Sequence, residues 1–303
     1  MKMRIVSAVL IAALAAAPLA AHADGKMTVA YAGSMGVVMD HGLGPSFTKQ
    51  TGVAYQGIGQ GALALAHLLA AGTMHADVFV SITPGPVKIL EKAGLVTDAV
   101  PIASTAMVIA YSPKSSFAAQ LAEAAAGKRA WYKVLEEKNF RFGRTDPATD
   151  PQGQNILFTF QLAETYYHQP GLSARILGPS VNPAQIFAEP AMLADLDDGQ
   201  LDATSGYESA VKSLHLPFIR LPDQINLSNP AMAAQWYSKA AVTLTIKGQT
   251  KIVHTQPLVF YAAVLKNAQN PQAAAEFVKL LTSPQGQKIL HDDGYSAPKG
   301  GNI

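Results

Sequence analysis

Apolar and polar residues along the chain form two alternating kinds of segment. Short apolar runs bounded by glycine predict buried strands, and longer runs with apolar residues three or four apart predict helices. We expect strands at 26–33, 53–61, 76–82, 104–113, 140–144 and 251–266, and helices at 34–52, 62–72, 83–94, 151–167, 271–283 and 284–294, with a helix–strand–helix series at 188–214. Strands that alternate with helices predict α/β architecture with mainly parallel sheets covered on both faces.

The long apolar strands expected at 104–113 and near 257–266 lie symmetrically about the middle of the chain. The simplest arrangement is two α/β lobes joined where these strands cross between them, with a ligand cleft between the lobes. Lobe 1 is expected to contain residues 24–108 and 262–303, and lobe 2 residues 109–261.

The first 23 residues have the layout of a secretory signal peptide. Lys2 and Arg4 precede an apolar run at 5–19, and Ala21-His22-Ala23 follows as a small-x-small cleavage site. The run is short for a membrane span and contains Pro18. We therefore expect cleavage near Ala23–Asp24 and a periplasmic protein.

The charge and the cysteine content of the chain exclude several kinds of partner and covalent modification. Removal of Lys2 and Arg4 would leave 21 basic and 21 acidic residues, without a basic block suited to nucleic acid or an anionic membrane. The chain has no cysteine, so it must be stabilised without disulfides, and no lipid can be attached to cysteine at the cleavage site.

Three predicted strand-to-helix junctions could bind an anion. They are Gly33-Ser34, the glycine-rich stretch 57–61, and the stretch 149–153. Helix N-termini at the carboxyl ends of strands offer N–H groups and the positive end of the helix dipole. Each junction could also be a simple N-cap. The glycine spacing at 57–61 fits neither the dinucleotide fingerprint nor the phosphate-binding loop.

Ala32-Gly33-Ser34-Met35-Gly36 differs at one position from the G-x-S-x-G elbow of serine hydrolases. However, this serine follows the first strand, and no histidine stands in a recognisable partner context. A secreted serine hydrolase is thus a remote alternative, and no catalysis is expected. The histidines lack metal-ligand spacing.

Longer motifs resemble one family over nearly the whole chain after residue 24. They are "YAGSM", "GQGALALAHLLAAGTMHADVFVS", "RTDPATDPQGQNILFTFQLAETYY" and "DGQLDATSGYESAVKSLHLPFIRLPDQINLSNPAMAAQWYSK". Together they resemble the periplasmic molybdate/tungstate-binding proteins of ABC transporters, and most closely the tungstate-binding branch. The resemblance implies a two-lobed periplasmic-binding-protein fold of type II, with mixed sheets and crossover strands between the lobes.

The resemblance also implies a set of ligand-binding residues. Ser34 matches a serine donor, Gln60 stands where a second serine is common, Asp150 matches a carboxylate that reaches the metal centre, and Tyr207 matches a tyrosine near the anion. Gly61 joins this set, and the secondary candidates are Gly33, Ser81, Asp146, Ser205 and Glu208. Gly206 stands where the tungstate branch has a second carboxylate.

The function implied is capture of a tetrahedral oxyanion by domain closure, as a monomer, for a permease in the inner membrane. No cofactor is expected, and no metal beyond the oxyanion's own centre. If Asp150 lines the pocket, molybdate or tungstate is favoured, because a desolvated carboxylate repels sulfate. If Asp150 only caps a helix, sulfate, a phosphorus oxyanion or an organic anion remains open. Ferric iron is a further alternative, since Tyr166-Tyr167 resembles the tyrosine pairs of iron-binding periplasmic proteins.

Overall fold

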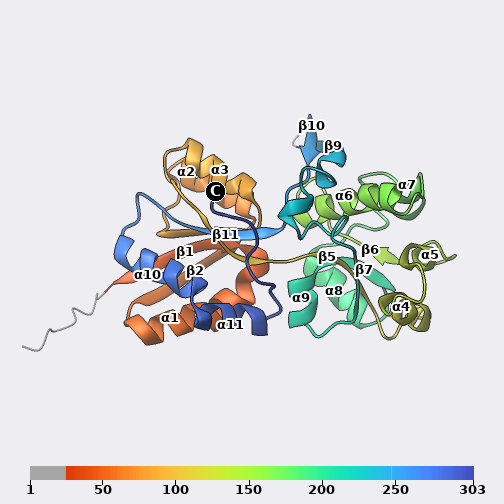
Figure 1. Ribbon diagram of the computed structural model, residues 1–303, viewed down its shortest axis with the longest axis horizontal. Helices are drawn as coiled ribbons and strands as arrows, with labels where there is room; N and C mark the ends of the chain where they lie inside the picture. The colour runs from red at the N-terminus through yellow and green to blue at the C-terminus, as the bar shows by residue number, and fades with distance from the viewer. Residues whose placement is uncertain (1–24, 247) are drawn as a thin grey trace, which may run out of the picture.

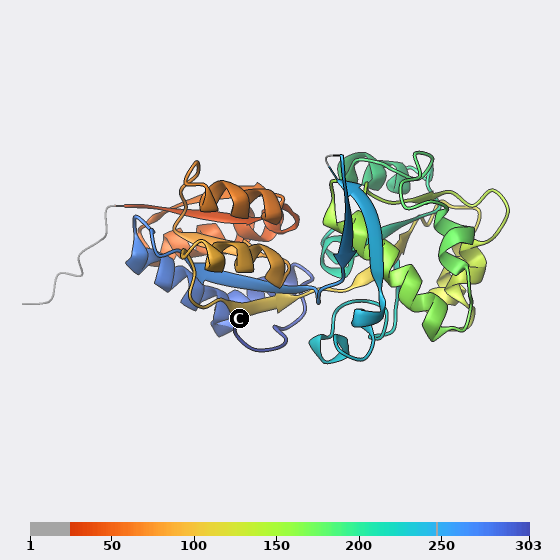
Figure 2. The ribbon, with the colours of Figure 1, turned by 90° about the horizontal axis from the view of Figure 1, so that it is seen from above.

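The computed structural model describes residues 25–246 and 248–303; the expected signal peptide lies outside this part of the chain. The described residues form two α/β bodies that lie side by side and are joined by thin connecting segments (Figure 1). The view from above shows the same separation (Figure 2). Each body is built on its own sheet, and no helix in the described residues is long and apolar enough to cross a membrane.

The first sheet has five strands in the order β2-β1-β3-β11-β4. Its strands are β1 (Lys26–Ala32), β2 (Ala54–Gln60), β3 (Val78–Ser81), β4 (Val100–Ser104) and β11 (Val259–Val264). Strand β1 pairs in parallel with β2 and β3, whereas β11 pairs antiparallel with β3 and β4. The strands are apolar because helices cover the sheet, and β3 is buried at every position.

The second sheet has four strands in the order β6-β7-β5-β8. They are β5 (Met107–Tyr111), β6 (Phe142–Gly143), β7 (Ala203–Tyr207) and β8 (Phe218–Arg220). Strand β6 is parallel to β7, and β5 is antiparallel to both β7 and β8. A separate antiparallel hairpin consists of β9 (Ala241–Ile246) and β10 (Gln249–His254), and β9 packs against α6.

The helices of the first body are α1 (Gly44–Thr51), α2 (Ala62–Ala70), α3 (Pro84–Lys92), α10 (Pro271–Thr282) and α11 (Pro284–Asp292), with the 3-10 turn η1 (Gly33–Met35) and the π-helix η2 (Val38–Leu43). Those of the second are α4 (Ala118–Ala125), α5 (Trp131–Leu135), α6 (Pro151–Tyr166), α7 (Leu172–Leu177), α8 (Glu189–Asp197) and α9 (Glu208–Ser213), with the 3-10 turns η3 (Pro230–Met232) and η4 (Tyr237–Lys239). Proline at the start of α3, α6, α10 and α11 removes an N–H that would lack an intrahelical partner.

The two long strands predicted from the sequence are each divided in two. The stretch 104–113 contains the end of β4 and all of β5, and 251–266 contains most of β10 and all of β11. Each division lies where the chain passes between the bodies: the Thr105 N–H donates to the Leu258 carbonyl, and the Met107 N–H donates to the Asn226 carbonyl. The predicted single strands are therefore wrong, because their apolar runs continue across a change of sheet.

The prediction of a two-lobed α/β fold with mixed sheets is confirmed. Antiparallel pairs are more frequent than expected, since strands next to the crossings, β5 and β11, join their sheets antiparallel. The hairpin β9–β10 was not predicted, because residues 251–254 of β10 were assigned to the long strand 251–266 and β9 was assigned to no element.

Candidate functional site

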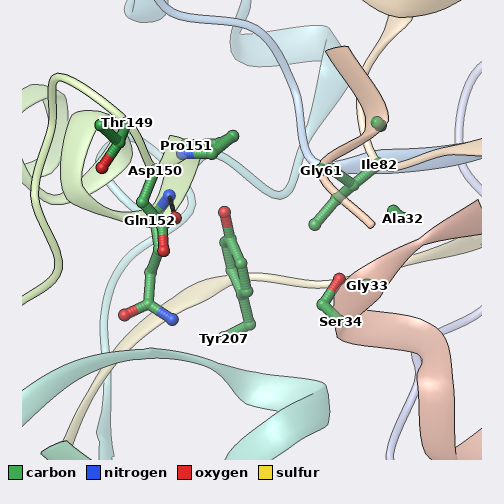
Figure 3. Close-up of a pocket in the computed structure, with 11 residues that line it drawn as sticks. Ala32, Gly33, Ser34, Gly61, Ile82, Thr149, Asp150, Pro151, Gln152 and Tyr207 are labelled. Atoms are coloured by element: carbon green, nitrogen blue, oxygen red, sulfur yellow. Dashed lines mark hydrogen bonds between the residues drawn. The ribbon is translucent and has the colours of Figure 1, made fainter. Parts of the chain in front are cut away.

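A cavity of about 280 Å³ lies between the two bodies. The first body contributes Ala32, Gly33, Ser34, Gly61, Ala62 and Ile82, and the second contributes Thr149, Asp150, Pro151, Gln152 and Tyr207. Figure 3 shows the Tyr207 hydroxyl pointing into the space between these two groups. The cavity is therefore lined by residues from six separate elements or junctions, and neither body contains it alone.

The first wall is built where β1 ends. Ser34 is partly exposed and lies in η1, directly after Gly33. The Tyr295 hydroxyl donates a hydrogen bond of 3.0 Å to the Ser34 carbonyl, which fixes this turn to the C-terminal segment. The Ser34 hydroxyl can donate to an oxygen atom in the cavity, and its backbone is held independently of any ligand.

The start of α2 forms the next part of this wall. Gly61 is the N-cap residue, and no side chain caps the first turn of this nine-residue helix. The N-terminus therefore presents backbone N–H groups and the positive end of the helix dipole beside the cavity. Such a terminus favours a negatively charged ligand.

The second wall is the start of α6, where Asp150 is the N-cap. Its Oδ1 accepts a hydrogen bond of 2.8 Å from the Gln152 backbone N–H. Asp150 also lines the cavity. The sequence left open whether this side chain caps a helix or lines the pocket, and in the structure it does both. Its own N–H donates to the Asp146 carbonyl at 2.8 Å, which closes the loop before the helix.

The electrostatics of Asp150 are unusual for a surface carboxyl. Burial raises the pKa of Asp150 above its ordinary value, and the charge of nearby Asp146 adds to this effect. The hydrogen bond from the Gln152 N–H acts in the opposite direction. The site thus contains a carboxyl whose protonated form is favoured relative to a solvated aspartate.

Two buried hydrogen bonds hold the polar groups of the second wall. The Asn155 Nδ2 donates to the Tyr207 hydroxyl oxygen at 3.0 Å, and the Ser205 hydroxyl donates to the Gln152 Oε1 at 3.2 Å. Tyr207 is 5% exposed and Asn155 6% exposed, so their hydrogen bond is almost completely shielded from bulk water. Helix α6 and strand β7 are joined at the cavity by these bonds.

Five of the ten predicted site residues line the cavity: Gly33, Ser34, Gly61, Asp150 and Tyr207. The other five, Gln60, Ser81, Asp146, Ser205 and Glu208, do not. Gln60 ends β2 with its side chain exposed, whereas Ser81 is fully buried and donates to the Thr83 carbonyl. Asp146 accepts from the Ala148 N–H within its own loop.

Glu208 faces a different part of the second body. Its Oε1 accepts from Lys212 at 2.8 Å and from Arg220 at 2.7 Å, and all three residues line a second cavity with Lys299. Glu208 is therefore a partner of two cations in the structure described here. At Gly206, where the tungstate branch has its second carboxylate, an added Cβ would lie 3.0 Å from the Val211 Cγ1, so any side chain there would require Val211 to shift.

Six further residues line the cavity: Ala32, Ala62, Ile82, Thr149, Pro151 and Gln152. Thr149, Pro151 and Gln152 belong to the junction 149–153, which the sequence predicted as a possible anion site without naming them as individual ligand-binding residues. Ala32, Ala62 and Ile82 contribute backbone or apolar surface, for which the residue type gives no signal. No group of three or more histidine, aspartate or glutamate side chains in the described residues could hold a metal ion.

A family model described as bacterial extracellular solute-binding protein matches residues 27–296. The chain belongs to this family. The family predicted from the sequence motifs is thereby confirmed as one of solute-binding transport proteins. An extracellular location of the family also agrees with the predicted secretion.

Some relatives of this solute-binding protein are named for a ligand, and others are not. An uncharacterised solute-binding protein of Petrotoga mobilis is 30% identical over 207 residues, which cover 66% of this chain and 62% of that protein. The molybdate/tungstate-binding protein WtpA of Pyrococcus abyssi is 29% identical over 210 residues, covering 63% of this chain and 59% of that one. The match thus spans about three-fifths of the length of these two relatives.

Solved structures share the fold of this solute-binding protein. The periplasmic molybdate-binding protein of Azotobacter vinelandii superposes with a TM-score of 0.61 at 16% identity, covering 90% of this chain and 100% of that one. The sulfate-binding protein SubI of Mycobacterium tuberculosis superposes with a TM-score of 0.57 at 14% identity, covering 90% and 87%. These likenesses establish the fold, which is shared by proteins named for different anions.

Proposed function

We propose that this protein is the periplasmic solute-binding component of an ABC importer and captures molybdate or tungstate between its two lobes. The lobes proposed are the two bodies built on the two sheets; the boundaries expected from the sequence, at 108/109 and 261/262, fall within β5 and β11, each of which belongs to one sheet, so the proposed boundaries lie just before these strands. The observation that carries the proposal is the cavity in which Ser34 and the start of α2 face Asp150 and Tyr207. The name of the relative WtpA supports the choice of ligand.

The donor set suits a tetrahedral oxyanion. The Ser34 and Tyr207 hydroxyls and the uncapped start of α2 can donate to oxygen atoms from opposite sides. An oxyanion without protons can only accept hydrogen bonds, so these groups match its chemistry. Closure of the lobes would remove water from the cavity and strengthen each of these interactions.

Asp150 favours a metal-centred oxyanion over sulfate. An ionised carboxylate repels any dianion at short range, and sulfur in sulfate accepts no further ligand. Molybdenum and tungsten can accept an additional oxygen ligand, so a carboxylate beside them gains an attractive interaction. A protonated Asp150, favoured by burial, could instead donate to an oxygen of the anion.

The remaining parts of the proposal follow from the same role. The protein acts as a monomer in the periplasm, catalyses no reaction, and presents its closed form to a membrane permease. The hydrolase alternative lacks support because, among the residues that the structure describes, the lining of the cavity beside Ser34 contains no histidine. Ferric iron lacks support because neither Tyr166 nor Tyr167 lines the cavity. The Tyr167 hydroxyl instead accepts a hydrogen bond of 3.2 Å from the Trp131 Nε1.

Calorimetric titration of the secreted chain, beginning at Asp24, tests the proposal. Molybdate, tungstate, sulfate, phosphate and ferric citrate are added separately to protein dialysed against a chelator. We expect saturable binding of molybdate or tungstate at one site per chain, and a matching increase in melting temperature. If only sulfate, phosphate or ferric citrate binds, molybdate and tungstate are not the ligands. If none of the five compounds binds, oxyanion capture is contradicted.

A further inference from the structure

A second cavity, of about 230 Å³, lies where the C-terminal tail (residues 296–303) meets the second body. Helix α9, strands β5 and β8 and the loop after β8 line it from the second body, and Lys299 lines it from the tail. Its three basic residues, Lys212, Arg220 and Lys299, outnumber its two acidic residues, Glu208 and Asp223. The cavity therefore has a formal excess of positive charge, which favours an anion.

Glu208 compensates part of this charge through a single oxygen atom. The Lys212 Nζ and the Arg220 Nη2 donate to the Glu208 Oε1 at 2.8 and 2.7 Å. An ammonium has three N–H donors and a guanidinium has five, so both cations keep donors for a further acceptor. The Arg220 side chain is 69% exposed, which places the guanidinium at the mouth of the cavity, where an anion can enter.

The ammonium of Lys299 has a neutral partner. Its Nζ donates to the Ser228 hydroxyl at 3.3 Å. The Asp223 carboxylate is likewise held by neutral groups, since the side-chain amides of Asn226 and Asn229 donate to its two oxygens at 3.3 and 3.0 Å. The positive charge of Lys299 is therefore the one best placed to gain from an added anion.

The lining suits a small inorganic oxyanion. The oxygens of such an anion accept hydrogen bonds, and ammonium and guanidinium groups form strong charge-assisted hydrogen bonds with them. The hydroxyls of Ser228 and Ser296 add neutral donors to the same lining. The volume of about 230 Å³ is close to the 280 Å³ of the cavity between the bodies, so a tetrahedral oxyanion fits either.

The two cavities are separate although they are close in the chain. Tyr207 lines the first cavity and the next residue, Glu208, lines the second. The Tyr295 hydroxyl is bonded to Ser34 in the wall of the first cavity, and the next residue, Ser296, lines the second. No described residue lines both cavities, so an anion in the second cavity would occupy a site of its own.

An anion in the second cavity would also connect the two bodies. The tail is paired with the first sheet, because the backbone N–H groups of Ser104 and Ser296 donate to each other's carbonyls at 2.9 and 3.0 Å. Arg220 belongs to β8 of the second sheet. An oxyanion that contacts Lys299 and Arg220 therefore bridges the tail of one body and the sheet of the other.

We propose that the second cavity is a binding site for a small inorganic oxyanion, with Lys212, Arg220 and Lys299 as its charged ligand-binding residues. The inference goes beyond the proposed function, since it does not depend on which solute the first cavity captures. Sulfate and its analogue selenate are suitable probes, because both are tetrahedral dianions at neutral pH and selenium can be located by anomalous diffraction.

The location is tested by crystallography. Crystals of the secreted chain, grown without sulfate or phosphate, are soaked in selenate, and anomalous data are collected at the selenium edge. We expect a peak within hydrogen-bonding distance of the Lys299 Nζ and the Arg220 guanidinium, with or without another peak in the first cavity. A peak in the first cavity alone, peaks only elsewhere on the surface, or no peak would overturn the proposed site.

Equilibrium dialysis with radiolabelled sulfate at low ionic strength tests the charged residues in solution. Lys299→Met and Arg220→Met should each weaken the binding of this sulfate about tenfold, because a charge-assisted hydrogen bond is lost. Lys251→Met is the matched control, since it makes the same change of charge on the exposed strand β10, and it should change the affinity by less than about twofold. Equal losses in Lys299→Met and Lys251→Met would show a general charge effect and contradict the site.

The same dialysis with Ser34→Ala separates the two cavities. Sulfate bound in the second cavity should be retained in Ser34→Ala and weakened in Lys299→Met. Sulfate binding that depends on Ser34 and is unchanged in Lys299→Met would belong to the first cavity and overturn the inference. Melting temperatures without anion confirm that each variant is folded. Tungstate capture is measured separately, so either conclusion can fail while the other stands.

Discussion

Ser34 and Asp150 line one cavity from opposite bodies of the protein, although they are 116 positions apart in the chain. Ser34 lies after the first strand of one sheet, and Asp150 begins the helix that packs on the other. A ligand that contacts both must span the two bodies. Such a ligand couples its own binding to the relative position of the lobes.

Replacement of Ser34 by alanine tests whether this residue binds a ligand or acts as a nucleophile. Ser34→Ala should weaken tungstate binding about fivefold to tenfold, because one neutral hydrogen bond is lost. Its melting temperature without ligand should equal that of the wild type, since the hydroxyl is partly exposed and only the Ser34 carbonyl is bonded to Tyr295. Ester hydrolysis by the wild type that disappears in Ser34→Ala would contradict the account.

Replacement of Asp150 by asparagine tests the selectivity argument. Asparagine caps a helix as well as aspartate does, so the start of α6 should be retained. Without the carboxylate, sulfate meets less repulsion, and tungsten loses an oxygen ligand. The affinity ratio of tungstate to sulfate should therefore fall about tenfold in competition titrations. An unchanged ratio would mean that Asp150 serves only as a cap.

The raised pKa of Asp150 also makes a stability prediction. A carboxyl whose folded-state pKa is raised contributes stability below its unfolded value, and this contribution is lost as pH rises through the folded-state pKa. The stability of the wild type relative to Asp150→Asn should therefore decrease from pH 3.5 toward pH 7. Urea unfolding of the ligand-free proteins across this range measures the difference; an increase with pH would show that the hydrogen bond from Gln152 outweighs burial.

Gly153 allows the loop before α6 to lie against the helix. An added Cβ would overlap the Thr145 carbonyl oxygen and lie 2.7 Å from the Pro147 nitrogen, both of which are backbone atoms. Gly153→Ala should displace the loop that carries Asp150, lower stability by about 1–3 kcal/mol, and weaken tungstate binding. Gly36→Ala is the matched control, since Gly36 has helical angles and open space around its Cβ position. Equal melting temperatures for the two variants would contradict this reading.

Site residues could be predicted from the sequence where they stand at a recognisable junction between a strand and a helix. Ser34 and Gly61 follow β1 and β2, whose carboxyl ends meet at one edge of the first sheet, and Asp150 begins α6 in the second body. Of the residues taken from the family resemblance, Tyr207 lines the cavity, whereas Glu208 and Gln60 do not. Glu208 is held by Lys212 and Arg220, and Gln60 points to solvent, because the direction of a side chain depends on packing that short-range patterns do not contain.

The crossings between the bodies show a second limit of sequence reading. Apolar periodicity indicates burial without indicating in which sheet a residue is buried, so most of β10 and all of β11 appeared as one strand. Asn155 shows a third limit. In the sequence it is an isolated polar residue within an apolar helix. Its hydrogen-bond partner, Tyr207, is 52 positions away and could not be predicted from the local pattern.

The most direct test of the central claim is a crystal structure of the secreted chain with tungstate, with anomalous diffraction collected at the tungsten edge. We predict one strong anomalous peak per chain, enclosed by Ser34, the start of α2, Asp150 and Tyr207, with the lobes closed around it. A peak elsewhere on the molecule, or no peak in crystals grown at saturating tungstate, would contradict the account.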